Sequence, residues 1–303
     1  METGVKAAMA GGYTTVCLMS DDEMPLDSPE NIEHIAEKSA NLPISILPVG
    51  SLSVNHEGKE LCEFSQMVKK GAIAFSDNES PVHNSQFLRY ALEYSKMNNV
   101  PVINYSRDND LSAGGVVNES ILSTKLGLKG FPDISEAIIV FRDLTIAEKV
   151  NARIHLAMVS TKKSISIIRD FQKKGVQATA DVTPHHIFFN ENAISNYNSN
   201  AKVYPPLRSE EDRKEMIKAI RNKVVTCICS DHNPHSSEDK EKDIKHAPFG
   251  TVSLESAFSA IYTELSNNKF SISDIIKLFT QGPKEAMNLN VEMIEEGNNA
   301  NLT

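Results

Sequence analysis

Short β-rich runs alternate with longer amphipathic runs along almost the whole chain, and this alternation is what most constrains its fold. The β-rich runs predict seven strands, at residues 13–19, 43–49, 71–75, 100–105, 153–158, 176–183 and 224–230. The runs between them carry apolar residues three and four positions apart, as in Phe87, Ala91 and Tyr94, which predicts helices. A strand followed by a helix, repeated many times, favours parallel strands joined by helical crossovers.

Two α/β architectures agree with this alternation. Seven strand–helix units predict a (β/α)₈ barrel of the TIM type that lacks one strand. The alternative is a doubly wound open sheet, which is less favoured because no glycine-rich phosphate loop follows the first expected strand. The chain opens in a helix-like segment, so we expect the barrel to be truncated before its second strand. We expect residues 1–290 to form the barrel domain and 291–303 to begin a truncated C-terminal segment.

The composition limits the classes of function. The chain has 303 residues, 40% of them hydrophobic, which is enough to bury a sizeable core. Its net charge of −9 argues against nonspecific binding to nucleic acid or to an anionic membrane, because both need basic patches. There is no apolar stretch of transmembrane length, no signal-peptide core and no Cys-x-x-Cys pair. We therefore expect a cytoplasmic protein without nucleic-acid or membrane partners.

Four residues stand where a barrel enzyme keeps its chemistry, directly after expected strands. They are Asn78, Tyr105, Met158 and Asp231. Only Asp231 carries a carboxylate that suits a hard or borderline cation. Asn78 is a neutral amide, Tyr105 is a phenol with an ordinary pKa of about 10, and Met158 is a soft thioether. We therefore expect no metal at these strand ends.

Several strings, in order over nearly the whole chain, carry a resemblance to one family. They include TGVKAAMAGGYTTV, GAIAFSDNESPV, HLAMVSTKKS, VTPHH, PPLRSEEDR, SDHNPH and APFG. Together they resemble the dihydroorotases of the bacterial multifunctional-complex type, within the amidohydrolase superfamily. The resemblance implies a (β/α)₈ barrel with a small flanking β-sandwich, of which this chain lacks the first strand and most of the sandwich. It also implies zinc-dependent interconversion of dihydroorotate and N-carbamoyl-aspartate in pyrimidine biosynthesis.

The resemblance assigns roles to individual positions. Zinc ligands of the family fall on Asn78, Tyr105, Met158 and Asp231, and only Asp231 keeps the family residue, which also moves the proton. The family's His-x-His pair lies before the chain begins. Positions that contact substrate in the family are matched by His235, Phe249 and Gly250, whereas two family asparagines fall on Asp21 and Tyr204.

Because three zinc-ligand positions of the family, Asn78, Tyr105 and Met158, carry other residues, we expect a non-catalytic pseudoenzyme or scaffold with no cofactor. By resemblance its partners would be aspartate carbamoyltransferase and a second copy of the chain. One alternative is an active zinc-dependent cyclic amidohydrolase with a relocated site, built from Asp231 together with Asp77, His185, His186, His232 and His235. Another is a fragment of a longer enzyme. We expect His155 to be a core residue with its hydrogen bonds satisfied, or one that supports a residue at the site. We expect Arg107 to pair with Asp108 or Asp231.

Overall fold

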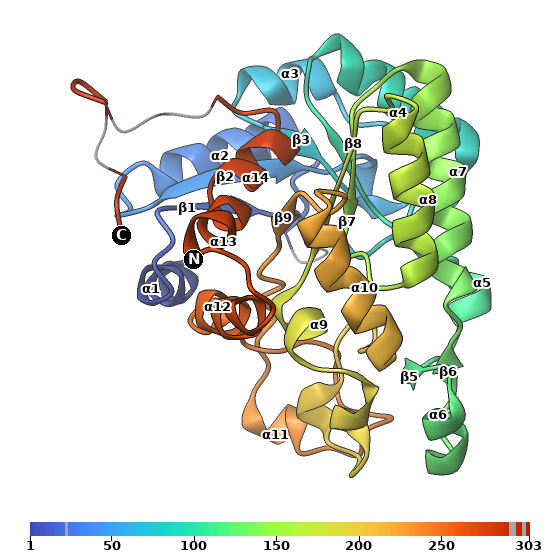
Figure 1. The fold of residues 1–303 in the computed structure, drawn as a ribbon. Helices are drawn as coiled ribbons and strands as arrows, with labels where there is room; N and C mark the ends of the chain where they lie inside the picture. Colours follow the sequence, from blue (N-terminus) through green and yellow to red (C-terminus); the bar gives the residue numbers. More distant parts are fainter. Residues whose placement is uncertain (22–23, 291–294, 299–300) are drawn as a thin grey trace.

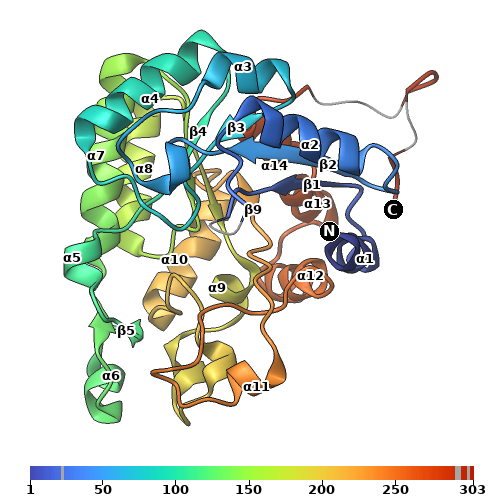
Figure 2. The ribbon, with the colours of Figure 1, turned by 180° about the vertical axis from the view of Figure 1, so that it is seen from behind.

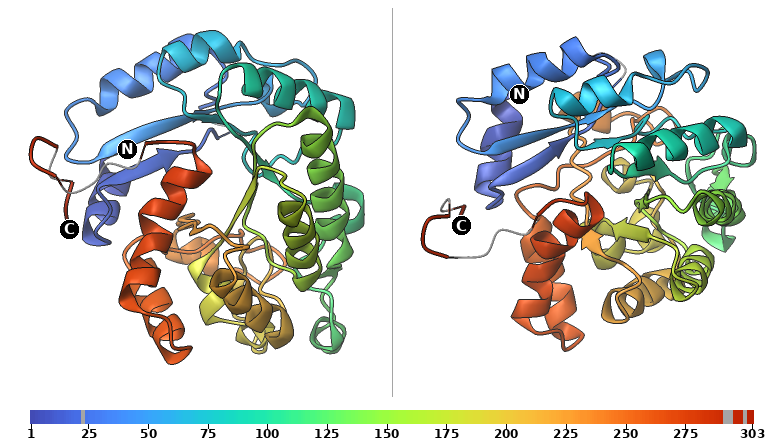
Figure 3. Two further views of the ribbon diagram at one scale, coloured as in Figure 1. Left: turned by 45° about the horizontal axis from the view of Figure 1, so that its top comes forward. Right: turned by 90° about the horizontal axis from the view of Figure 1, so that it is seen from above.

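The computed structural model describes residues 1–21, 24–290, 295–298 and 301–303 (Figure 1). Within these residues, seven parallel strands form one sheet in the order β1-β2-β3-β4-β7-β8-β9. The strands are β1 (Thr15–Leu18), β2 (Ser45–Gly50), β3 (Ala74–Phe75), β4 (Val102–Tyr105), β7 (Ile154–Ala157), β8 (Ala178–Val182) and β9 (Cys227–Ile228). Figure 3 shows the sheet curling with helices outside it, which is the (β/α)₈ barrel expected, with seven of its strands.

Helices alternate with the strands and begin where the sequence supplies caps. Asn84, Thr161 and Ser209 each accept a hydrogen bond from a backbone N–H in the first turn of the helix that follows. The helices are α1 (Glu2–Ala10), α2 (Pro29–Ser39), α3 (Phe64–Lys69), α4 (Ser85–Met97), α5 (Asn109–Ser112), α6 (Ile121–Leu126), α7 (Ile134–Val150), α8 (Lys162–Lys173), α9 (Pro184–Phe188), α10 (Glu210–Arg221), α11 (Ser237–Lys240), α12 (Ala257–Asn267), α13 (Ile272–Phe279) and α14 (Gln281–Ala286).

The main core lies between the sheet and its outer helices. Leu88, Leu92 and Leu144 of α4 and α7 are fully buried against Ile154 of β7 and the neighbouring strands. The two views in Figures 1 and 2 show α4, α7 and α8 side by side on the outside of these strands. Packing of this kind fixes the strands, and with them the residues that follow each strand.

A small arm interrupts the barrel between β4 and α7. It consists of β5 (Val117–Asn118), α6 and β6 (Gly130–Phe131), with β5 and β6 paired in parallel (Figure 1). The sequence did not predict these strands, because two residues are too few to show a period. No helix among the described residues is long and apolar enough to cross a membrane. Residues 291–294 and 299–300, part of the expected C-terminal segment, lie outside the described residues.

Candidate functional site

Sharp turns follow three of the strands at the end of the barrel that we call the mouth. Asn78, Met158 and Asp231 follow β3, β7 and β9, with left-handed φ values of 50°, 52° and 47°. Residues other than glycine rarely adopt this conformation, which persists where surrounding contacts impose it. At Met158 the backbone N–H donates to Oδ1 of Asp181 at 2.7 Å. The backbone of the mouth is therefore held in a strained form at three of the four positions singled out in the sequence, all except Tyr105.

Aromatic side chains fill the mouth. Tyr105, Phe131, Met158, Tyr204 and Phe249, here called the mouth cluster, pack against one another. The Tyr204 ring lies at the centre, with its centroid 5.2 Å from that of Tyr105, 5.3 Å from that of Phe131 and 5.6 Å from that of Phe249. Tyr105 is 3% exposed and Met158 is 8% exposed. Two of the strand-end positions thus form part of an apolar cluster.

The two phenols of the mouth cluster are held in their neutral form. Burial raises the pKa of Tyr105 well above its ordinary value, and Tyr204, Glu79 and Asp231 add to this rise. Burial also raises the pKa of Tyr204 to about 12, although the nearby Arg107 guanidinium opposes the rise. Neither oxygen is therefore available near neutral pH as a phenolate ligand or base.

Arg107 stabilises the outer side of the cluster. Its guanidinium carbon lies 4.6 Å from the centroid of the Tyr204 ring, and Nη2 donates to the Glu79 carbonyl at 3.2 Å. Arg107 therefore contacts the Tyr204 ring and the Glu79 carbonyl, in place of the expected ion pair with Asp108 or Asp231. Asp108 instead accepts a hydrogen bond from the Leu111 N–H at the start of α5.

Asp231 and His185 are the polar pair that the mouth brings together. His185 Nε2 lies 3.2 Å from Oδ2 of Asp231, and both side chains are about nine-tenths buried. The angles at this contact do not meet hydrogen-bond geometry, so both ring nitrogens of His185 remain buried without a hydrogen-bond partner. This pair is the part of the expected relocated site that the structure assembles.

His186 and His232, the other histidines near the mouth, form hydrogen bonds with neighbouring loops. His186 contacts the Thr183 hydroxyl at 2.6 Å and the Pro205 carbonyl at 3.1 Å, and burial lowers its pKa well below the ordinary value. Nδ1 of His232 accepts the Ser253 N–H at 3.1 Å. These contacts give both rings hydrogen-bond partners within the protein.

Asp77, the remaining acid of the relocated set, faces the loop after β2. Its Oδ1 accepts the N–H groups of Leu52 and Ser53 at 2.8 and 2.9 Å, and Oδ2 accepts the Ser53 hydroxyl at 2.5 Å. All these partners belong to one neighbouring loop. Asp77 therefore fastens β3 to β2 and does not join Asp231.

The three expected substrate-contact residues lie in one folded loop. His235 Nε2 contacts the Phe249 carbonyl at 2.6 Å, and Gly250 has a φ of 125°. A Cβ on Gly250 would lie 2.5 Å from the Asn233 carbonyl oxygen, so this close approach requires glycine. The structure therefore brings His235, Phe249 and Gly250 together, with Phe249 directed into the mouth cluster.

Two lysines that the sequence did not single out anchor this loop. Nζ of buried Lys202 donates to the carbonyls of Ile244 and Ala247 at 2.8 and 2.6 Å, and it lies 4.5 Å from the Phe249 ring centroid. Nζ of Lys240 donates to the Gly250 carbonyl at 2.8 Å. A lysine within an apolar run, as in AKVYPPL, was the only sequence signal for such a role.

A buried polar network joins the arm to the barrel. Nη1 of Arg208 donates to Oδ1 of Asn118 at 2.9 Å, and Nε donates to the Ser160 hydroxyl, also at 2.9 Å. Glu136 accepts the N–H groups of Ser160 and Thr161 at the start of α8. These groups satisfy one another and leave none directed at a ligand.

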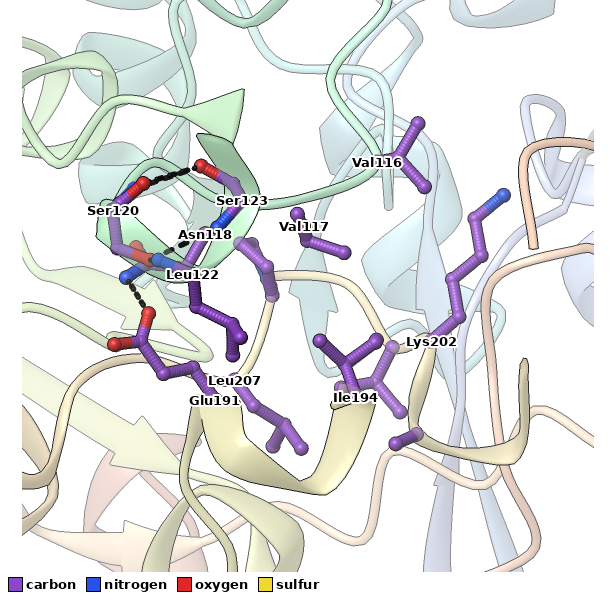
Figure 4. A pocket seen from close by; sticks show the side chains of 13 residues that line it. Val116, Val117, Asn118, Ser120, Leu122, Ser123, Glu191, Ile194, Lys202 and Leu207 are labelled. Atoms are coloured by element: carbon purple, nitrogen blue, oxygen red, sulfur yellow. Dashed lines mark hydrogen bonds between the residues drawn. The ribbon is translucent and has the colours of Figure 1, made fainter. Parts of the chain in front are cut away.

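A small cavity lies beside this network (Figure 4). It is lined by apolar side chains of the arm and of the 310 turn Glu191–Ile194, and the figure shows Asn118 bonded to Glu191 at its edge. Its free volume of about 10 Å³ leaves room for a single water molecule. The cavity is thus too small for a substrate.

One group of three donors within the described residues has the spacing of a metal site, and it lies inside the barrel below the mouth. It comprises His155 of β7, Asp181 of β8 and Cys227 of β9, whose donor atoms lie within 4.8 Å of one another. His155 Nε2 contacts Oδ2 of Asp181 at 2.8 Å, and Nδ1 contacts the Thr179 hydroxyl at 2.8 Å. His155 is therefore a satisfied core histidine, as expected, but the group of three was not foreseen.

The solved structures similar to this one are barrel enzymes, and they confirm the fold class. L-Hydantoinase (dihydropyrimidinase) from Arthrobacter aurescens matches with a TM-score of 0.81 at 18% identity, over 94% of this chain and 65% of that chain. Dihydropyrimidinase from Brevibacillus agri NCHU1002 matches with a TM-score of 0.79 at 18% identity, over 98% of this chain and 68% of that chain. Identities this low support the fold alone.

Similarity in sequence gives the family. A family model described as dihydro-orotase-like matches residues 1–164. The dihydroorotase of Caldicellulosiruptor saccharolyticus is 37% identical over 304 residues, which cover all of this chain and 71% of that protein. The dihydroorotase of Staphylococcus aureus strain Mu50 is 35% identical over 305 residues, which cover 100% of this chain and 72% of that protein. The chain belongs to the dihydroorotase-like family.

Proposed function

We propose that this chain is a dihydroorotase-like protein of pyrimidine biosynthesis that does not hydrolyse dihydroorotate and acts as a scaffold. One observation carries the proposal: the mouth cluster occupies positions where the family resemblance places zinc ligands and substrate contacts. Tyr105 and Met158 stand at two ligand positions and Tyr204 at a substrate position, and all three are buried against other side chains.

The chemistry of the donors supports the same proposal. A catalytic zinc takes three protein ligands and keeps one position open. Asp231 and His185 supply two suitable donors at the mouth. Tyr105 is a neutral phenol, Met158 offers a soft thioether, and Asn78 offers an amide, so this donor set does not fit the family zinc.

The test is an assay of the whole chain in both directions, with dihydroorotate and with N-carbamoyl-aspartate as substrates. We expect no turnover above the protein-free rate, with or without added zinc. A cooperative thermal transition measured on the same sample would show that the protein assayed is folded. Turnover that disappears in Asp231→Asn would overturn the proposal.

One observation favours a second candidate function, an active cyclic amidohydrolase with an altered zinc site. The imidazole of His185 is buried beside Asp231 without a hydrogen-bond partner, and buried groups of this kind are found at catalytic sites. Relatives at 34–37% identity are named dihydroorotases. This candidate predicts metal-dependent amide hydrolysis that His185→Gln abolishes, with the exposed His246→Gln as the matched control.

A scaffold requires partners, and the family resemblance suggests two. We propose aspartate carbamoyltransferase as the first and a second copy of this chain as the other, both in the cytoplasm. Pull-down of the tagged chain from native lysate should enrich the transferase, and light scattering should give twice the chain mass of 33.4 kDa. A monomer that enriches no transferase would argue against both.

A further inference from the structure

The interior of the barrel contains three metal-binding side chains on three adjacent strands. His155, Asp181 and Cys227 are between 1% and 5% exposed. In the strand register, Asp181 is opposite Cys227, and His155 is opposite Thr179. His155 precedes Met158 by three residues and Cys227 precedes Asp231 by four, so this group lies deeper in the barrel than the residues of the mouth.

The three donors match the preferences of one kind of cation. An imidazole nitrogen, a carboxylate oxygen and a thiolate are together typical of zinc and of cobalt(II), which substitutes for it. Bond lengths of 2.0–2.3 Å in a tetrahedral site imply donors separated by about 3.3–3.7 Å. The three donor atoms lie within 4.8 Å of one another, so an ion needs adjustments of about 1 Å or less.

Hydrogen bonds already orient the side chains of His155 and Asp181 as in a metal site. The Thr179 hydroxyl lies 2.8 Å from Nδ1 of His155, which leaves Nε2 as the nitrogen facing the group. The Met158 N–H donates to Oδ1 of Asp181 at 2.7 Å, which leaves Oδ2 facing it. Hydrogen bonds to the far atom of each ligand are a regular feature of protein metal sites.

Cys227 has no part in the hydrogen bonds that satisfy the other two. Its neighbours in the interior are apolar, with Val49, Ala74 and Ile103 in the same cluster. Burial in this apolar surrounding raises the pKa of the Cys227 thiol well above its ordinary value.

We propose that His155, Asp181 and Cys227 bind one zinc-class divalent cation inside the barrel. On binding, the Cys227 thiol loses its proton to solvent and the cation separates His155 Nε2 from the Asp181 carboxylate. The ion links β7, β8 and β9 and stabilises the barrel. This inference is independent of the proposed loss of hydrolysis, because the site lies below the mouth and none of its three ligands belongs to the mouth cluster.

Cobalt(II) titration of the metal-free whole chain tests the site. We expect one cobalt per chain, with a near-ultraviolet thiolate-to-cobalt charge-transfer band. The band should be lost in Cys227→Ser and kept in Cys62→Ser, whose thiol is buried in another part of the core. Thr179→Val should keep the band and weaken binding about tenfold, since it removes only the orienting hydroxyl.

Two results would overturn the inference: no cobalt retained after gel filtration, or a band unchanged in Cys227→Ser. Thermal unfolding gives a second readout that does not depend on cobalt. Zinc should raise the melting temperature of the parent chain and of Cys62→Ser but not that of Cys227→Ser. Neither readout uses hydrolysis, so a failure here is distinguishable from a failure of the proposed function.

Discussion

Replacing Tyr204 by alanine should remove the centre of the mouth cluster and destabilise the whole barrel. The ring is 7% exposed and contacts the rings of Tyr105, Phe131 and Phe249. Truncating a large buried aromatic side chain costs about 3–5 kcal/mol, because apolar burial is lost and a cavity remains. Loss of the Arg107 contact with the ring adds about 0.5–1 kcal/mol at this partly exposed site.

The expected decrease in the free energy of unfolding is therefore about 5 kcal/mol. Urea unfolding followed by circular dichroism measures it as a shift of the midpoint at unchanged slope. Tyr204→Phe is the matched control: it keeps the ring and should lose about 1 kcal/mol or less, with the hydroxyl. A decrease below about 1 kcal/mol for Tyr204→Ala would show that the rings are not packed together. The main observation behind the proposed function would then be removed.

Three further predictions concern other parts of the molecule. Lys202→Met should speed proteolysis of residues 240–250, because it removes the buried ammonium that holds this loop, whereas the exposed Lys242→Met should not. Burial raises the pKa of Asp143 to about 6, so its contribution to the free energy of unfolding should fall, by up to about 3 kcal/mol, as pH rises from about 4 to 6. The raised value means that the folded state holds the proton more tightly than the unfolded state, so Asp143→Asn should flatten this part of the stability–pH curve measured by urea unfolding. Asn84→Ala should cost about 1 kcal/mol in the same measurement, because its side chain caps α4.

The seven strands could be read from the sequence because each lies in a run rich in apolar or β-branched residues. The expected strand at 224–230 is found, but only Cys227–Ile228 pairs with β8, since residues further along turn into the mouth. The arm of β5 and β6 was missed because its strands are two residues long. Strand ends depend on tertiary pairing, which a periodic pattern does not contain.

The candidate site was predicted in part. The family resemblance predicted His235, Phe249 and Gly250 as substrate contacts; this role stays a prediction, and the structure places the three residues in one loop. It could not show that Tyr105 packs on Tyr204, because such a contact between distant residues depends on the fold. Lys202 was missed because a lysine is ordinarily a surface residue, and the Cys227 group was missed because its three members stand on different strands.

The left-handed backbone at Asn78, Met158 and Asp231 has an evolutionary consequence. The chain turns at all three positions through a left-handed φ, and under the proposed function the side chains of Asn78 and Met158 do not suit the family zinc. Introducing metal ligands at these positions would require point substitutions such as Met158→His, with no rebuilding of loops. A barrel of this kind remains a short mutational distance from metal binding, which makes it a practical starting scaffold for directed evolution of a hydrolase.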